Sequence, residues 1–277
     1  MKELSPIAFF DSGYGGLTIL ERVRALMPEY DYLYLGDNAR NPYGTRSFDV
    51  VYQYTKECVE KLFELGSPLV ILACNTASAK ALRNIQQNDL PLSDDPSRRV
   101  LGVIRPSVEQ LGRISKTKHV GVFATQGTVN SNSYPLETAK IWPYIIIHQQ
   151  ACPMWVPIVE NNEFDGDGAD FYIQKYVDAL MKQSPLIDTI ILACTHYPLL
   201  LKKIRKYLPN GIQIISQGDI IAHSLQEYLA HHPEMQRRIS RGASVRFLTT
   251  ESCSKFEDTA SIFFSGDLNV QHISLDR

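Results

Sequence analysis

Two cysteines follow apolar segments of the same design. The segment "SPLVILAC" ends at Cys74, and "SPLIDTIILAC" ends at Cys194, 120 residues later. Each thiol is followed by small polar residues, "NTAS" or "THYP", and then by a helix-like segment. A lone cysteine at the end of an apolar run is usually a small buried hydrophobe. Because the chain repeats the whole unit, we favour a chemical role for both cysteines.

Both thiols are expected where a parallel strand ends and a helix begins. Ligands of open parallel sheets bind at the carboxyl ends of the strands. Helix N-termini there offer free peptide N–H groups and a partial positive charge, which favour anionic ligands and thiolates. Asp11 and Thr125 also follow apolar strands, in "PIAFFDSGYGG" and "HVGVFATQGTV". The pattern indicates a site for an anionic ligand flanked by thiols.

Three kinds of reaction use thiols in this way. A disulfide oxidoreductase usually holds a CxxC pair, and the chain has none. A cysteine hydrolase needs one thiol with a histidine base, which Cys194 and His196 supply, and it leaves Cys74 dispensable. An inversion at carbon needs one base on each face. Two similar halves with one cysteine each suit this third reaction best.

Other polar residues near these strand ends have two interpretations each. Asp11 either caps the next helix or supports a thiol or a substrate ammonium. The glycine-rich segment "DSGYGG" does not fit the G-x-G-x-x-G pattern, so it is weak evidence for dinucleotide binding. As a tight turn, it can still bring Ser12 and peptide N–H groups to a ligand. His196 either only begins a helix or acts beside Cys194. Glu160 is expected on a helix surface unless the fold brings it to His196.

The turn Pro42-Tyr43-Gly44 lies in a long polar loop and can present backbone donors to a second carboxylate, although its composition also fits an ordinary turn. Of the remaining cysteines, Cys58 lies on the apolar face of a helix and is expected in the core. Cys152 is either a wall of the site or a packing residue.

Composition and charge exclude several classes of protein. The net charge of −2 and the isoelectric point near 6.4 give no electrostatic signature of nucleic-acid binding. No apolar run approaches the length of a membrane span, and the first residues contain no apolar core of a secretion signal. Five widely spaced cysteines without a CxxC pair argue against a structural zinc site and indicate reduced thiols. We therefore expect a cytoplasmic protein without bound metal.

Apolar strands alternate with amphipathic helices along the 277 residues. Strands that are apolar on both faces and separated by helices predict parallel sheets covered on both sides. We expect two similar open parallel-sheet α/β domains related by pseudo-symmetry, with the active site in the cleft between them. The first domain comprises residues 1–100 and 217–277, the latter as a returning segment, and the second comprises residues 101–216. Strands are expected at 6–10, 30–36, 69–74, 100–104, 119–125, 143–148, 189–194, 211–216 and 244–250, and helices at 17–27 and 47–66.

The chain resembles glutamate racemases of the cofactor-independent aspartate/glutamate racemase superfamily over nearly its whole length. The resemblance rests on "FFDSGYGGLTIL", "LGDNARNPYGTRS", "ILACNTASA", "GVFATQGTVNSNSY", "CPMWVPIVE" and "ILACTHYPLL", in that order. It implies interconversion of L- and D-glutamate without a cofactor, to supply D-glutamate for peptidoglycan and cell-wall formation. It also suggests a homodimer. An aspartate racemase and a non-catalytic, D-glutamate-binding regulatory protein remain alternatives.

The resemblance also implies roles for individual residues. Cys74 takes the α-proton from D-glutamate and Cys194 takes it from L-glutamate, with Asp11 and His196 assisting the thiols and Glu160 supporting His196. The implied substrate contacts are Asp11, Ser12, Tyr43, Gly44, Asn75, Thr76, Thr195 and His196. Family members often carry an Asp-Ser pair where this chain has Ser216 and Gln217, which bears on how the last segment meets the site.

Overall fold

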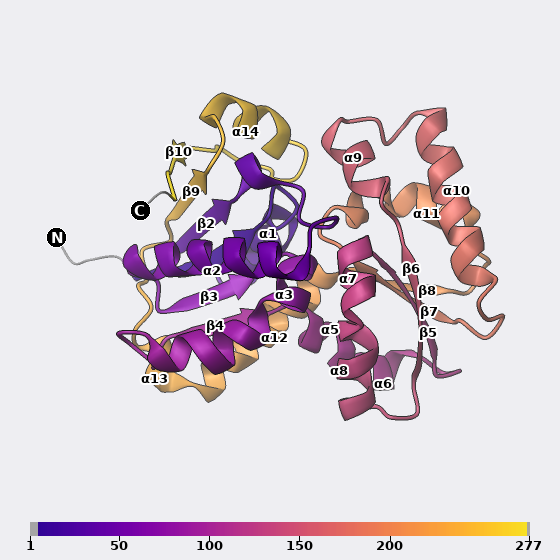
Figure 1. Ribbon diagram of the computed structural model, residues 1–277, viewed down its shortest axis with the longest axis horizontal. Coiled ribbons are helices and arrows are strands. Elements are labelled where there is room, and N and C mark those ends of the chain that lie inside the picture. Colours follow the sequence, from indigo (N-terminus) through magenta and orange to yellow (C-terminus); the bar gives the residue numbers. More distant parts are fainter. Residues whose placement is uncertain (1–4, 276–277) are drawn as a thin grey trace. The chain divides into compact units, whose positions relative to one another are not determined.

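The computed structural model describes residues 5–275. The chain divides into two compact units (Figure 1). The described residues of Met1–Val103 and Gly218–Arg277 form unit 1, and Ile104–Gln217 form unit 2. Unit 1 is therefore built from two separate pieces of chain, whereas unit 2 is one continuous segment.

Unit 1 is built around a parallel sheet, sheet A, with the strand order β10-β9-β2-β1-β3-β4. Its strands are β1 (Ile7–Asp11), β2 (Tyr32–Gly36), β3 (Leu69–Leu72), β4 (Arg99–Gly102), β9 (Val245–Thr249) and β10 (Val270–His272). The three central strands β1, β2 and β3 are buried along their whole length. The continuous apolar runs of the sequence are thus explained by burial of both faces of the sheet.

The helices of unit 1 all lie between these strands along the chain. They are α1 (Leu17–Leu26), η1 (Asn38–Arg40), α2 (Phe48–Glu64), α3 (Asn75–Lys80), α4 (Leu82–Asn84), η2 (Ile85–Asp89), η3 (Leu90–Leu92), α12 (Gln217–His231, whose first residue belongs to unit 2), α13 (Pro233–Gln236) and α14 (Cys253–Ala260). Helix α2 begins where Ser47 Oγ accepts a hydrogen bond from the N–H of Val50 at 3.4 Å. It ends just before Gly66, whose φ of +91° favours glycine.

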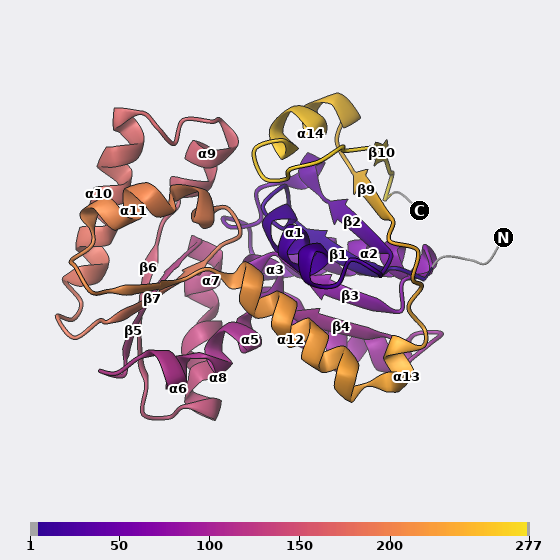
Figure 2. The same cartoon turned by 180° about the vertical axis from the view of Figure 1, so that it is seen from behind.

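Helices cover both faces of sheet A. The side chains of Ala8 and Phe10 from β1 form one buried cluster with Val51 and Cys58 of α2. Since side chains alternate along a strand, the neighbouring residues of β1 face the other layer. Figures 1 and 2 show α2 and α3 on one face and α1 and α12 on the other. The prediction that Cys58 lies in the core is confirmed, because its side chain is fully buried there.

Unit 2 is built around a second parallel sheet, sheet B, with the order β6-β5-β7-β8. Its strands are β5 (His119–Ala124), β6 (Ile146–Ala151), β7 (Thr189–Ala193) and β8 (Gln213–Ile215). Its helices are α5 (Ile104–Glu109), α6 (Leu111–Ile114), α7 (Gln126–Ser131), α8 (Ser133–Ile141), α9 (Trp155–Glu160), α10 (Asp167–Met181), η4 (Tyr197–Leu200) and α11 (Leu201–Tyr207).

The two sheets share one order of strands. If the strands of each unit are counted from its first strand, β2-β1-β3-β4 and β6-β5-β7-β8 are both second-first-third-fourth. In this order the second strand is added on one side of the first strand, and the third strand is added on the other side. Open α/β sheets bind ligands at this switch point, between the first and the third strand. Asp11 ends the first strand of sheet A and Cys74 follows the third; Thr125 and Cys194 hold the matching positions in sheet B. The predicted fold class, two similar parallel-sheet α/β domains, is confirmed.

Two parts of the sheets differ from the sequence-based expectation. The expected strand at 143–148 begins only at Ile146, because Trp142 and Ile145 are joined by a turn hydrogen bond of 2.9 Å. The short strand β10 was not expected, since it has three residues, two of them exposed. It pairs with β9, which itself pairs with β2, so the end of the described chain completes sheet A.

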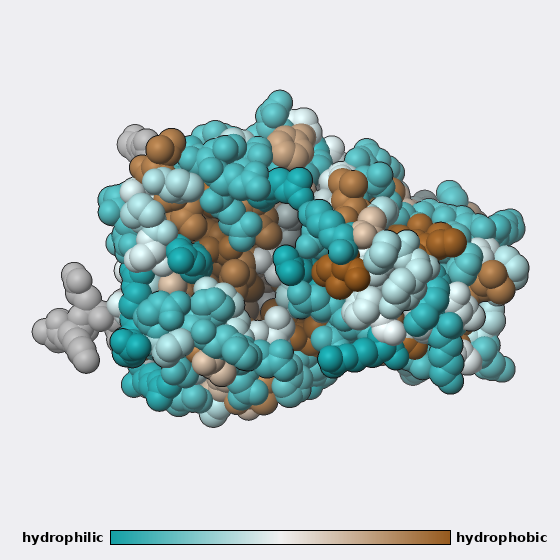
Figure 3. Space-filling view, turned by 90° about the horizontal axis from the view of Figure 1, so that it is seen from below, coloured by the Kyte–Doolittle hydropathy of each residue, from teal (hydrophilic) through white to brown (hydrophobic). Residues whose placement is uncertain are grey.

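The face of the molecule shown in Figure 3 carries mainly hydrophilic residues, with hydrophobic residues gathered in a few patches. Such patches are normal on folded chains, because polar groups cannot cover the whole surface. Within residues 5–275, the structure contains no helix that is both long and apolar enough to cross a lipid bilayer.

Candidate active site

Cys74 lies between strand β3 and helix α3, where the chain turns from extended to helical. It is the N-cap residue of α3, and its Sγ accepts a hydrogen bond from the N–H of Ala77 at 3.4 Å. The Sγ also lies 3.5 Å from Ser12 Oγ, to which the thiol can donate. Only 7% of Cys74 is exposed. The thiol is thus held by a peptide N–H at a helix start and by the serine of the "DSGYGG" loop.

Asp11 ends β1, the strand next to β3, and its side chain is fully buried. Its Oδ2 accepts a hydrogen bond from the N–H of Gly13 at 3.1 Å. Helix α1 begins after Gly16, which is its N-cap residue, so Asp11 does not cap that helix. A Cβ on Gly16 would lie 2.8 Å from the Cβ of Asp11. The glycines therefore let the loop fold closely over this carboxylate.

Tyr34 supports this loop from β2, and sequence reasoning missed it. Its hydroxyl donates a hydrogen bond of 3.0 Å to the carbonyl of Gly13. Burial raises the pKa of Tyr34 well above its ordinary value, and the negative charges of Asp11 and Cys74 raise it further. The phenol therefore stays a neutral donor. No sequence signal marks it, because a tyrosine in a buried strand is usually a packing residue.

The turn at Tyr43 and Gly44 is anchored by a buried side chain. Only 1% of Tyr43 is exposed, and its hydroxyl donates to the carboxylate of Asp37. The ring therefore packs inward. Among the residues that the structure describes, the peptide N–H groups of Tyr43 and Gly44 donate to no acceptor. The contact of this turn with a second carboxylate stays a prediction.

In unit 2, Cys194 follows β7 and is joined to a histidine and a carboxylate. The Nδ1 of His196 lies 3.8 Å from Cys194 Sγ, within the range of a hydrogen bond to sulfur. The Nε2 of the same ring lies 2.9 Å from Glu160 Oε1 at the end of α9. The structure thus brings together three of the residues that the sequence nominated. Glu160 is not a simple surface residue of its helix.

The charge of His196 follows from these contacts. Burial lowers the pKa of the imidazole, but hydrogen bonds to Cys194 and Glu160, and the negative charges of both groups, raise it to about 10. The ring is therefore protonated at neutral pH. Both of its nitrogens then carry protons, so one can face Glu160 while the other faces the sulfur of Cys194.

Cys152 and Tyr197 are also buried near Cys194. Only 1% of Cys152 is exposed. Burial raises the pKa of its thiol well above the usual value, and the nearby charge of Cys194 adds to this effect. Its carbonyl accepts a hydrogen bond of 3.2 Å from the hydroxyl of Tyr197. Cys152 is therefore a neutral packing residue beside the site. Cys253, in contrast, is the half-exposed first residue of α14.

Gln217 lies where the family pattern differs. Its side chain is buried, and its Nε2 donates to Ser107 Oγ at 2.7 Å and to Tyr134 Oη at 3.0 Å. The pKa of Tyr134 is raised mainly by burial, and the charge of Cys194 raises it further. Gln217 therefore belongs to a buried polar cluster in the same unit as Cys194.

The remaining nominated residues lie at the starts of helices. Asn75 and Thr76 are the first residues of α3, and Thr195 is buried between Cys194 and His196. Thr125 is the N-cap residue of α7, where its Oγ1 accepts a hydrogen bond from the N–H of Thr128 at 3.2 Å. Each unit thus gathers small polar side chains and the cysteine after its third strand at the same edge of its sheet.

Both units are doubly wound α/β units with a cysteine directly after the third strand, an arrangement that suits enzymes in which thiols act as acid–base groups. Comparison with known proteins specifies the family. Residues 17–225 match the family model described as Asp/Glu/Hydantoin racemase. The chain belongs to this family of racemases, and the predicted enzyme class, an isomerase, is confirmed.

Relatives match over nearly the whole chain. A glutamate racemase from Roseobacter denitrificans is 39% identical over 269 residues, which cover 93% of this chain and 96% of the relative. The crystal structure of glutamate racemase isoform RacE1 from Bacillus anthracis is 33% identical, with a TM-score of 0.88 over 99% of this chain and 98% of that one. A glutamate racemase from Francisella tularensis, solved in complex with D-glutamate, is 28% identical, with a TM-score of 0.87 over 99% of both chains. The resemblance to glutamate racemases is confirmed.

Proposed function

We propose that the protein interconverts L-glutamate and D-glutamate by two-base proton transfer at Cα. A thiolate removes the α-proton from one face of the carbon and leaves its electron pair in the adjoining carboxylate system. The second thiol then donates a proton to the opposite face. The product is the other enantiomer, and the two cysteines have exchanged their protonation states. No net oxidation occurs and no other reactant is consumed.

One observation carries this proposal: the first four strands of each unit have the same order, and each unit has a cysteine after its third strand. An inversion makes equal chemical demands on the two faces of one carbon. Two units of like construction, each with a cysteine after its third strand, supply one base for each face of the carbon. A hydrolase needs only one of them.

In unit 2, Cys194 acts on L-glutamate, and His196 is its partner. The protonated ring is held by Glu160 with one N–H toward the sulfur. This positive charge stabilises a thiolate at Cys194 and the negative charge that develops on the substrate. Thr195 and His196 also contact the substrate in this proposal.

In unit 1, Cys74 acts on D-glutamate and is held by Ser12 and by the N–H of Ala77. Asp11 lies at the adjacent strand end, where it assists the thiol and keeps the substrate ammonium charged. Asn75 and Thr76, at the start of α3, bind the α-carboxylate. The peptide N–H groups of Tyr43 and Gly44 bind the side-chain carboxylate.

The resemblance to glutamate racemases supports a place for this reaction in the cell. The protein supplies D-glutamate for peptidoglycan, acts in the cytoplasm and forms a homodimer. The widely spaced cysteines agree with a reducing compartment.

The test is isotope exchange at Cα in heavy water. Wild-type protein, without added cofactor, should replace the α-proton of both enantiomers by deuterium while optical rotation is lost. Cys74→Ser and Cys194→Ser should abolish racemisation. Any exchange left in Cys74→Ser should favour L-glutamate, and any left in Cys194→Ser should favour D-glutamate. Cys253→Ser serves as the control, because this half-exposed cysteine lies outside the site and its loss should change neither rate.

Other outcomes have defined meanings. Full racemisation by Cys74→Ser would reject the two-base mechanism and favour chemistry at one thiol. Exchange with aspartate but not with glutamate would keep the mechanism and reject the substrate. Binding of D-glutamate without any exchange would identify a regulatory protein.

A further inference from the structure

The loop between β2 and α2 carries the turn to which we assign the side-chain carboxylate of the substrate. Its only regular structure is the short helix η1 (Asn38–Arg40), so side-chain contacts must hold the peptide groups of Tyr43 and Gly44. We propose that Asp37 is the positioning residue for this turn. The proposal rests on the glutamate racemisation proposed above and adds a determinant of substrate affinity to it.

The carboxylate of Asp37 is fully buried and collects donors from two parts of unit 1. Its Oδ2 accepts from the hydroxyl of Tyr43 and, at 2.7 Å, from Nε of Arg40. Its Oδ1 accepts from Thr250 Oγ1 at 2.9 Å, just past the end of β9. A buried carboxylate needs such partners, so its contacts are kept in one arrangement. The ring of Tyr43 is thereby fixed against the end of sheet A.

Asp37 is itself tied to the first part of the site. Its peptide N–H donates a hydrogen bond of 3.0 Å to the carbonyl of Asp11, at the end of the neighbouring strand. The loop therefore starts from the same edge of the sheet that carries Asp11. A shift of Asp37 would move the Tyr43 turn relative to Asp11.

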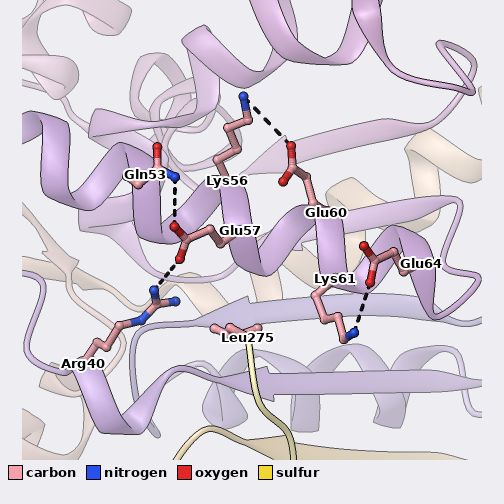
Figure 4. A pocket seen from close by; sticks show the side chains of 8 residues that line it. All are labelled: Arg40, Gln53, Lys56, Glu57, Glu60, Lys61, Glu64 and Leu275. Carbon is pink, nitrogen blue, oxygen red and sulfur yellow. Dashed lines mark hydrogen bonds and ion pairs between the residues drawn. The ribbon is translucent and has the colours of Figure 1, made fainter. Parts of the chain in front are cut away.

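Arg40 fastens the Asp37 contact to helix α2. Its NH1 group donates to Glu57, which also accepts from Gln53 Nε2 at 2.8 Å, and Figure 4 shows both contacts. Its NH2 group lies 3.5 Å from Cys58 Sγ in the core. The guanidinium also lies over the ring of Tyr54, 4.1 Å from its centroid. Burial opposes the charge of Arg40, but the charge of Asp37 and the bond to Glu57 raise the pKa of Arg40 above its ordinary value, so the guanidinium stays charged.

The other flank of the turn is held by the helix that follows Cys74. Lys80 of α3 is buried, and its Nζ donates a hydrogen bond of 2.6 Å to the carbonyl of Arg46. Arg46 Nε in turn donates to the carbonyl of Arg40 at 3.1 Å. The turn between Arg40 and Arg46 is thus closed on itself and attached at both sides. Asp37 is the carboxylate on which the Tyr43 and Arg40 contacts converge.

These contacts predict a specific kinetic effect. The side-chain carboxylate of glutamate lies away from the reacting carbon, and its charge does not change during the reaction. An interaction with it is equally strong in the ground state and the transition state, so its loss raises KM and leaves kcat unchanged. A general loss of structure would instead lower the amount of active protein.

The experiment is steady-state racemisation of glutamate by the Asp37→Asn variant. The asparagine amide has the same shape as the aspartate carboxylate. It lacks the negative charge opposite Arg40, and one of its two terminal atoms is no longer a hydrogen-bond acceptor. We expect KM to rise about tenfold while kcat stays within about threefold of wild type. Asp31→Asn is the matched control. Asp31 is as buried as Asp37, and the two residues flank β2, with Asp31 directly before it and Asp37 directly after it. The Asp31 carboxylate accepts a hydrogen bond of 3.1 Å from the N–H of Ser244, the residue before β9.

The control variant should lose stability but keep the wild-type KM. An unchanged KM in Asp37→Asn, or an equal rise of KM in Asp31→Asn, would overturn the positioning role. Absence of glutamate turnover in wild-type protein would count against the proposed function itself, which separates the two failures.

A second variant covers the case in which Asp37→Asn does not fold. Tyr43→Phe removes only the hydroxyl that donates to Asp37 and keeps the ring, which packs between Phe10 and Tyr54. We expect KM to rise about threefold at constant kcat. A folded Tyr43→Phe protein with the KM of wild type would overturn the proposal.

Discussion

The Nε2 atom of His196 lies 2.9 Å from Oε1 of Glu160, although 36 residues separate them in the chain. Both are held by regular structure, since Glu160 ends α9 and His196 directly precedes η4. The opposite nitrogen of the ring faces the sulfur of Cys194. Glu160 therefore fixes both the orientation and the charge of the group beside the thiol.

Replacing Glu160 by glutamine should impair chemistry at Cys194 more than at Cys74. The amide keeps a hydrogen-bonding partner for the ring but removes the negative charge that favours the imidazolium. We expect racemisation to fall by about ten- to a hundredfold, the usual scale for an impaired acid–base group. Measurement of deuterium exchange into each enantiomer should show a larger loss for L-glutamate than for D-glutamate.

Exchange is the informative quantity for this variant. The two enantiomers have equal free energies, so kcat/KM must be the same in both directions for every variant. An equal loss of exchange in the two enantiomers of glutamate would show that Glu160 does not act through Cys194.

Stability should fall with rising pH because of His196. Its pKa is about 10 in the folded protein and about 6.5 without neighbours, so the folded state binds the proton more tightly. The stabilisation is full below about pH 6.5 and is lost as the pH rises toward 10. Within that window the free energy of unfolding should drop by about 1 kcal/mol per pH unit. Urea unfolding of wild type and Glu160→Gln should show a shallower dependence in the variant, whose His196 has lost a negative neighbour.

A methyl group on Gly16 should damage unit 1. Its Cβ would lie 2.8 Å from the Cβ of Asp11 and 3.0 Å from that of Ala73, and neither neighbour is a flexible chain end. Gly16→Ala should therefore cost about 1–3 kcal/mol of stability, as overpacked sites do, and lower activity by displacing Asp11. Gly168→Ala is the control, because no atom lies within 4 Å of its Cβ position. Equal unfolding midpoints for the two variants would contradict the packing described here.

Gln217→Ala should weaken unit 2 through its buried polar cluster. The change removes the donor that serves Ser107 and Tyr134 and leaves a small void. We expect a loss of about 1–3 kcal/mol in the free energy of unfolding, the usual cost of disturbing buried hydrogen bonds. Chemical denaturation measures it directly. A variant as stable as wild type would mean that the two hydroxyls satisfy each other without the glutamine.

Much of the fold could be predicted because it follows from local patterns. The run Leu69–Leu72 is apolar throughout, and only a strand covered on both faces demands that. Ser47 caps the start of α2 with its side chain, and Gly66 has a positive φ just past its end. Both features are typical of these residue types, so the sequence predicts the limits of the helix. The two cysteine units in the sequence indicate the repetition of the sheets.

Other features could not be predicted because they depend on contacts between distant segments. Strand β10 is short and mostly exposed, and only pairing with β9 defines it. Tyr34 and Asp37 look like an ordinary strand residue and an ordinary loop residue. Their roles arise from hydrogen bonds to Gly13 and Thr250, which only the assembled sheet brings near. The contact of Glu160 with His196 was implied by family resemblance, not by spacing.

The interrupted path of the chain through unit 1 has a consequence for biosynthesis. Sheet B is complete in the continuous segment Ile104–Gln217, whereas sheet A still lacks β9 and β10 when that segment has been translated. Until β9 has been translated, β2 has an uncovered edge, which invites pairing with other chains. The part of the protein that carries Cys74 therefore finishes folding after the part that carries Cys194. A nascent chain arrested before Val245 would be prone to aggregate through β2.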